Sequence, residues 1–293
     1  MTGKIKSKAI IIMTSAVFAV STLLTACGGA STQESSGAGA GGTLKGTVTV
    51  SGSTSVQPLA QDLSDVFKDA EPGISVEVQG GGSTQGVKDA SEGNSDIGSS
   101  SRDLTAEEKN LGLTEHIIAY DGVAVVVHPS NNIANLSKDQ IVKIFKGEIK
   151  NWKDVGGSDK EILVVTREEG SGTRTAFEEL IGLQEKKDDK TFSLITTNAL
   201  TVDGTGAVKA SIASKENAIG YTSLGFVDDS MKKVSIDNLE CTVDTVKSKT
   251  YPISRPFILL TKGEVKPEVQ AFLDFILSDK GQEVVGESYV KVK

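Results

Sequence analysis

Three strand-like segments of this chain end in serine, threonine and glycine, and each passes directly into a helix-like segment. The connections lie at residues 51–55 (SGSTS), 80–84 (GGGST) and 170–173 (GSGT). Strands that alternate with helices are typical of an α/β fold with a mostly parallel or mixed sheet. In such folds ligands bind at the carboxyl ends of strands, close to helix N-termini. The pattern therefore limits both the fold class and the place where a ligand would bind.

The spacing of apolar residues indicates the individual elements. Residues 47–52 and 74–79 alternate between apolar and polar, as strands do, and residues 56–70 carry apolar side chains at helical spacing. Residues 116–129 are almost entirely apolar and predict a long buried strand. Ser137 is predicted to cap the helix that follows it.

Two long extended segments predict a division into two lobes. One lies around Asp121 and the other around Ser254, and we expect them to run as paired crossings between the lobes. The first lobe would then contain residues 47–122 and 252–293, and the second lobe residues 123–251. A chain of this length is sufficient for two such units.

The N-terminal segment has the features of an export signal. Lys4, Lys6 and Lys8 precede a long apolar stretch that ends in LTAC, with Cys27 as its last residue. By resemblance to bacterial lipoproteins, residues 1–26 would be a signal peptide and Cys27 would carry the lipid. The alternative is an ordinary signal peptide with an incidental cysteine. Residues 27–46 are rich in glycine and serine and predict a flexible tether to a membrane surface.

The net charge and the cysteine content argue against a nucleic-acid partner and against an internal disulfide. The net charge is −8, which argues against nucleic acid as a partner. An anion would be repelled overall, so an anion site must depend on local, directed hydrogen bonds. Cys27 and Cys241 are the only two cysteines. Acylation of Cys27 would leave no internal disulfide, and we interpret Cys241 as a buried or inert thiol.

Each of the three connections is a candidate anion site. A helix N-terminus has unpaired backbone N–H groups and a partial positive charge, and adjacent hydroxyl groups add donors. The alternative for each connection is ordinary N-capping by serine or threonine. Three connections of this kind in one chain favour the anion site.

The arginines support the same interpretation. Four of the 31 basic residues are arginine, and Arg167 and Arg174 flank the third connection while Arg102 follows GSSS. Arginine offers a planar set of donors that fits a tetrahedral oxyanion. Arg167, at the end of an apolar strand, is predicted to point into the site. For Arg102 and Arg174 a surface ion pair is an equal alternative.

Six motifs occur in an order that resembles a known family: SGSTSVQPL, GGGSTQGVK, SDIGSSSRDL, YDGVAVVVHP, TREEGSGTRTAF and AIGYTSLG. Together they resemble the phosphate-binding lipoproteins of bacterial phosphate ABC transporters, the PstS family. The resemblance implies a type II periplasmic-binding-protein fold, α/β, with two mixed sheets flanked by helices and inorganic phosphate held between lobes that close on it. It also implies a monomeric, lipid-anchored receptor without a cofactor, which delivers phosphate to membrane permease subunits.

The resemblance also implies a set of ligand residues. The first lobe would supply Thr54, Ser55 and Ser83. Ser101 and Arg102 are further candidates from the DIGSSSRDL segment, where this chain departs from the family. The second lobe would supply Arg167, Ser171, Gly172 and Thr173, where Gly172 contributes only its backbone N–H.

The resemblance does not supply the carboxylate of the site, because relatives have an aspartate where this chain has Ser101. At neutral pH phosphate carries a proton that a carboxylate can accept, whereas sulfate does not, and an unpaired buried carboxylate rejects the wrong anion. Asp121, which precedes Gly122 at the predicted crossing between the lobes, is the favoured acceptor, and Asp103 is the second choice. The alternative for Asp121 is a turn formed by the Asp-Gly pair.

Three other functions compete with the phosphate receptor. An enzyme is disfavoured because neither His116 nor His128 lies beside a nucleophile motif, and no residue spacing indicates a metal site. A receptor for another tetrahedral oxyanion, such as sulfate, molybdate or tungstate, would use the same connections. An adhesin or signalling lipoprotein would leave the repeated anion sites without a purpose.

Overall fold

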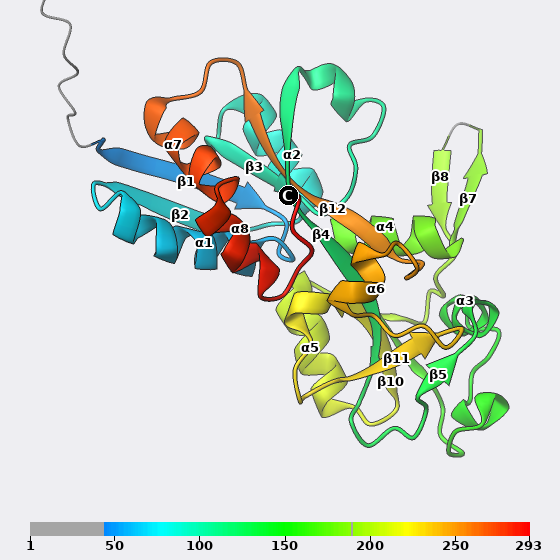
Figure 1. The fold of residues 1–293 in the computed structure, drawn as a ribbon. Helices are drawn as coiled ribbons and strands as arrows, with labels where there is room; N and C mark the ends of the chain where they lie inside the picture. The colour runs from blue at the N-terminus through cyan, green and yellow to red at the C-terminus, as the bar shows by residue number, and fades with distance from the viewer. Residues whose placement is uncertain (1–43, 189) are drawn as a thin grey trace, which may run out of the picture. The chain divides into compact units, whose positions relative to one another are not determined.

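A computed structural model describes residues 44–188 and 190–293. The signal peptide predicted at residues 1–26, Cys27 and all but the last three residues of the predicted tether lie outside the described residues. The described part is an alternation of strands and helices (Figure 1). Within that part, no helix is both long and apolar enough to cross a bilayer.

The strands are β1 (Gly46–Gly52), β2 (Ile74–Gly80), β3 (Ile97–Ser100), β4 (Leu113–Val127), β5 (Asn135–Leu136), β6 (Leu163–Arg167), β7 (Gln184–Lys187), β8 (Lys190–Ser193), β9 (Leu200–Val202), β10 (Ala218–Ser223), β11 (Lys232–Ile236) and β12 (Ser254–Lys262). The α-helices are α1 (Gln57–Ala70), α2 (Ser83–Glu92), α3 (Lys138–Lys146), α4 (Gly172–Ile181), α5 (Gly204–Ser214), α6 (Val243–Lys247), α7 (Pro267–Ile276) and α8 (Asp279–Gly286). Three short 3-10 helices lie at Glu108–Leu111, Trp152–Val155 and Leu224–Phe226.

One strand joins the two halves of the sheet. The strand order is β2-β1-β3-β12-β4-β10-β6-β9, with β11 paired to β4 and β5. The resemblance implies two mixed sheets, and the structure joins their strands into one ten-stranded sheet, while β7 and β8 form a separate two-stranded sheet. The cause is β4, because its residues 113–122 pair with β12 and its residues 123–127 pair with β10. The long apolar segment is therefore a single strand that serves both halves.

The first core lies between the strands β1 and β12 and the helices α1, α7 and α8. The rings of Phe67 and Phe272 lie 5.1 Å apart at a tilt, which is a favourable aromatic arrangement. Burying each of these rings contributes roughly 1.5–3 kcal/mol. The strand β12 is buried on both faces: Leu259 packs into this core, whereas Leu260 packs with Val87 of α2 on the opposite face.

The second core lies around β10, β6, α3 and α4. The rings of Phe177 and Tyr221 are stacked with centroids 4.1 Å apart, and Phe145 packs against Phe177 at 4.9 Å. Ser137 accepts a hydrogen bond from the Gln140 N–H and forms a capping box at the start of α3. The predicted cap is thereby confirmed.

Asp121 and Gly122 lie inside β4 and do not form a turn. Gly122 is required there because a Cβ atom would lie 2.5 Å from the sulfur of Cys241. Cys241 is buried, and burial raises the pKa of its thiol to about 12. At neutral pH the reactive thiolate is therefore nearly absent, which agrees with the inert thiol predicted from the sequence.

Candidate functional site

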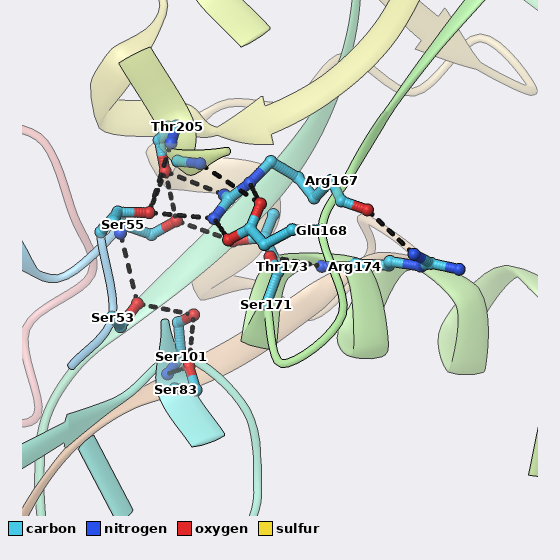
Figure 2. Close-up of polar contacts among 12 residues, drawn as sticks. Ser53, Ser55, Ser83, Ser101, Arg167, Glu168, Ser171, Thr173, Arg174 and Thr205 are labelled. Carbon is cyan, nitrogen blue, oxygen red and sulfur yellow. Dashed lines mark hydrogen bonds and ion pairs between the residues drawn. The ribbon is translucent and has the colours of Figure 1, made fainter. Parts of the chain in front are cut away.

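Four connections from a strand to a helix meet at one place in the structure. Parallel strands β1 and β2 lead into α1 and α2, and parallel strands β6 and β9 lead into α4 and α5. The carboxyl ends of parallel strands lie at the same edge of a sheet, so each pair brings its hydroxyl groups together. Ser101, which follows β3, joins them. This group of side chains is called the hydroxyl cluster below. It contains Ser53, Thr54, Ser55, Ser83, Ser101, Arg167, Ser171, Thr173 and Thr205, together with the backbone of Gly172. Figure 2 labels all of these residues except Thr54 and Gly172.

Hydroxyl groups bridge the two pairs of connections. The Ser55 Oγ atom lies 2.7 Å from the Thr173 Oγ1 atom and 3.2 Å from the Thr205 Oγ1 atom. The Thr54 Oγ1 atom lies 3.0 Å from the Thr205 Oγ1 atom and accepts a hydrogen bond from the Thr205 N–H at 3.2 Å. These partners are more than a hundred residues apart in the chain.

The serines of the first half form a second part of the cluster. The Ser53 hydroxyl donates to the Ser101 Oγ atom at 2.9 Å, and the Ser101 N–H donates to the Ser83 Oγ atom at 3.0 Å. The first residue of α4 lies directly against them, because a Cβ atom on Gly172 would be 2.1 Å from the Ser83 Oγ atom. Only glycine allows the two halves to approach this closely.

Arg167 supplies the positive charge of the cluster. Its residue is 1% exposed, and its Nη2 and Nη1 atoms donate to the Thr54 and Thr205 hydroxyls, each at 3.1 Å. Glu168 accepts from the Arg167 Nε and Nη2 atoms at 2.7 and 2.6 Å. Burial alone would raise the pKa of the Glu168 carboxyl, but the bonds from Arg167 and the Gly204 N–H hold that pKa below its usual value.

Ordinary capping explains only part of the cluster. Ser171 accepts from the Arg174 N–H as the N-cap of α4, and Ser53 accepts from the Ser55 and Val56 N–H groups in its own turn. By contrast, α2 and α5 have no side-chain cap. The Ser83 and Thr205 hydroxyls at their first turns face the cluster through the contacts above. Most of these hydroxyls therefore bond to one another or to Arg167 instead of capping a helix.

Besides Arg167, which is paired with Glu168, two predicted ligand residues lie in ion pairs, and these two pairs stand outside the cluster. The Arg102 guanidinium donates to Glu108 at 2.6 and 2.7 Å and to the Thr84 hydroxyl at 3.2 Å. Asp121 is paired with Arg255, and neither side chain bonds to a hydroxyl of the cluster. Asp103, the second choice for the carboxylate, is exposed. Arg102 and Asp121 are therefore bonded to partners that the fold places beside them.

The structure adds Thr205 and Glu168 to the predicted residues. The signal for Thr205 was present as VDGTG, a fourth run of glycine and threonine between a strand and a helix. That strand, β9, has only three residues, which is too short for an alternating pattern. In residues 44–188 and 190–293 no group of three His, Cys, Asp or Glu side chains is placed to hold a metal ion.

Comparison with known proteins places this architecture in a family. Residues 37–280 match the model of the PBP superfamily domain. The chain is 34% identical to the phosphate-binding protein PstS of Bacillus subtilis over 98% of this chain and 95% of that protein. It is 30% identical to the protein of the same name from Borreliella burgdorferi over 82% of this chain and 88% of that protein.

Solved structures agree with these relatives. One of these structures is a substrate-binding protein assigned to phosphate ABC transport in Clostridium perfringens, crystallised with bound phosphate. It is 44% identical to this chain. The match covers 85% of this chain and 100% of that protein, with a TM-score of 0.80. An ABC-type phosphate transport receptor from Vibrio cholerae is 36% identical to this chain. The match covers 84% of this chain and 100% of the receptor, with a TM-score of 0.69. The two-lobed α/β fold expected from the motifs is confirmed. This chain belongs to the PBP superfamily and, within it, to the family of the phosphate-binding protein PstS.

Proposed function

We propose that the protein is an extracytoplasmic receptor that binds inorganic phosphate and delivers it to the permease of a phosphate ABC transporter. The observation that carries the proposal is the buried hydroxyl cluster, in which four strand-to-helix connections surround one arginine. The relatives named for phosphate binding and the related structure with bound phosphate support this ligand.

The geometry suits a tetrahedral anion. Hydroxyl and backbone N–H donors approach from both halves of the chain, so one anion would receive hydrogen bonds from every side. Arg167 offsets the charge that phosphate brings into a buried site, where an unpaired charge is costly. Helix N-termini at the four connections add favourable partial charges. These directed donors offset, at the site, the repulsion that a net charge of −8 exerts on an anion.

The proposed ligand set follows the cluster. It comprises Thr54, Ser55, Ser83, Ser101, Arg167, Ser171, Gly172, Thr173 and the added Thr205. The lobes proposed at residues 47–122 with 252–293 and at residues 123–251 would each supply part of the set and would close on the anion. Arg102 and Asp121 remain predictions from the sequence, and their bonds to Glu108 and Arg255 support roles outside direct anion contact.

Another tetrahedral oxyanion is the second candidate ligand. Among the described residues, Glu168 is the one carboxylate that bonds to a member of the cluster, and Arg167 occupies both of its oxygens. A site without a free carboxylate has no group that rejects a fully ionised anion such as sulfate. This observation favours a fully ionised oxyanion such as sulfate as the second candidate ligand.

A calorimetric titration with phosphate, with and without a large excess of sulfate, tests the proposed function. We expect one phosphate per chain and an affinity that sulfate lowers only slightly. Loss of the phosphate signal in sulfate would assign the site to another oxyanion. Absence of any signal for phosphate would contradict the receptor function altogether.

Thr205→Val is expected to weaken phosphate binding about tenfold. The change keeps the shape of the side chain and removes the hydroxyl that accepts from Arg167 and contacts Thr54, and one hydrogen bond to a charged group contributes about 1.5–3 kcal/mol. The control is Thr201→Val, an exposed position on β9. Calorimetry that finds equal affinities for both variants would exclude Thr205 from the site.

Lipid attachment at Cys27 and the monomeric state belong to the same proposal. The support is the LTAC motif after the apolar stretch and the glycine- and serine-rich residues that follow it. An anchor of this kind would hold the receptor beside the permease at the membrane surface.

A further inference from the structure

A buried ion pair joins the two crossing strands beside the hydroxyl cluster. Arg255 on β12 and Asp121 on β4 are directly paired in the sheet. The Arg255 Nε and Nη2 atoms donate to the Asp121 Oδ2 atom at 3.1 and 2.9 Å. The two side chains are 1% and 0% exposed. Such a pair is costly to bury unless every donor and acceptor has a partner.

The remaining atoms of the pair reach in two directions. The Arg255 Nη1 atom donates to the carbonyl oxygen of Ser101 at 3.1 Å, and Ser101 is a member of the hydroxyl cluster. The Asp121 Oδ1 atom accepts from the Ser223 hydroxyl at 3.0 Å and from the Leu224 N–H at 3.1 Å, where β10 ends. A continuous path of hydrogen bonds therefore runs from the cluster to the end of β10.

We propose that Arg255 is a positioning residue for the anion site, held in place by Asp121. Arg255 would fix the peptide that carries Ser101, whose N–H and hydroxyl bond to Ser83 and Ser53. The inference rests on the proposed function, and it assigns Asp121 a role different from accepting the phosphate proton. Both Asp121 oxygens already accept two hydrogen bonds each, so no acceptor remains directed at the anion.

The geometry of Arg255 suits this role. Its planar guanidinium lies 5.4 Å from the centroid of the Phe257 ring, and it donates to Asp121 and Ser101 in fixed directions. A lysine at this position would keep the charge beside Asp121, but its single ammonium group cannot reproduce the fork. The charge and the hydrogen bond to Ser101 can therefore be separated by substitution.

The test compares three variants with wild type in purified protein. Arg255→Lys keeps the positive charge beside Asp121. The double variant Arg255→Gln with Asp121→Asn removes both charges of the pair. Neither variant therefore leaves an unpaired buried charge. Val269→Ala is the control, because it truncates a buried residue of the first core. Thermal unfolding measures stability, and calorimetry measures phosphate affinity at several pH values and with added sulfate.

We expect both Arg255 variants to bind phosphate about tenfold more weakly at every pH, with the preference over sulfate unchanged. Val269→Ala should lower the unfolding temperature and leave the affinity unchanged. Wild-type affinity in both Arg255 variants would reduce Arg255 to a structural residue and overturn the inference. A loss confined to the double variant, accompanied by altered pH dependence or sulfate preference, would also overturn it, since Asp121 would then accept the proton. If wild type itself binds no phosphate, the proposed function fails instead.

Discussion

Arg167→Ala is expected to reduce phosphate affinity by roughly 100-fold to 10,000-fold. The variant removes two directed N–H donors and the positive charge of the hydroxyl cluster, and each hydrogen bond to a charged group contributes about 1.5–3 kcal/mol. The effect is large because Arg167 is almost fully buried, so water cannot replace its interaction with the anion. Isothermal titration calorimetry of the purified protein measures the loss.

Two further variants separate charge from geometry. Arg167→Ala also leaves Glu168 without its partner, so the double variant Arg167→Ala with Glu168→Gln tests whether the loss comes only from an unpaired carboxylate. Lys209→Ala removes a cation that pairs with Asp228 at an exposed position and should bind like wild type. Near-wild-type affinity in Arg167→Ala would show that the anion binds elsewhere.

Gly172→Ala is expected to produce the second large loss, roughly 10-fold to 100-fold in affinity. The added Cβ atom would lie 2.1 Å from the Ser83 Oγ atom and 2.8 Å from the Ser101 Oγ atom, so the two halves of the cluster must separate. Forcing an extra carbon into a packed contact costs about 1–3 kcal/mol. Alanine is also a better helix former than glycine, so α4 itself should not be weakened.

Gly206→Ala is the matched control for this prediction. Gly206 also lies in the first turn of a helix at the cluster, α5, but a Cβ atom there would meet nothing within 4 Å. It should therefore bind phosphate as wild type does. Calorimetry and thermal unfolding of both variants are compared with and without phosphate. Equal affinities for the two would mean that the contact between α4 and Ser83 is not part of the bound state.

Local patterns determined much of the fold. The alternation of residues 74–79, the helical spacing of residues 56–70 and the apolar run that became β4 all appear as predicted elements. The Ser137 cap also appears, because capping depends on residues only three positions apart. The hairpin of β7 and β8 was not predicted, since residues 184–193 are rich in charge and mostly exposed.

The sequence by itself also indicated most of the candidate site. Hydroxyl groups and glycine at a strand-to-helix connection are visible in a short window, and eight of the ten predicted ligand residues lie in the cluster, where Gly172 contributes its backbone. The tertiary structure alone decided which charged groups lie in the cluster and which lie in ion pairs outside it. Arg102 bonds to Glu108, Asp121 bonds to Arg255, and Thr205 joins Thr54 across 151 residues. The Asp121–Arg255 and Thr54–Thr205 contacts depend on how distant strands and helices pack, and no local pattern of residues carries that information. Arg102 and Glu108 are only six residues apart, and their contact depends on how the loop between them folds.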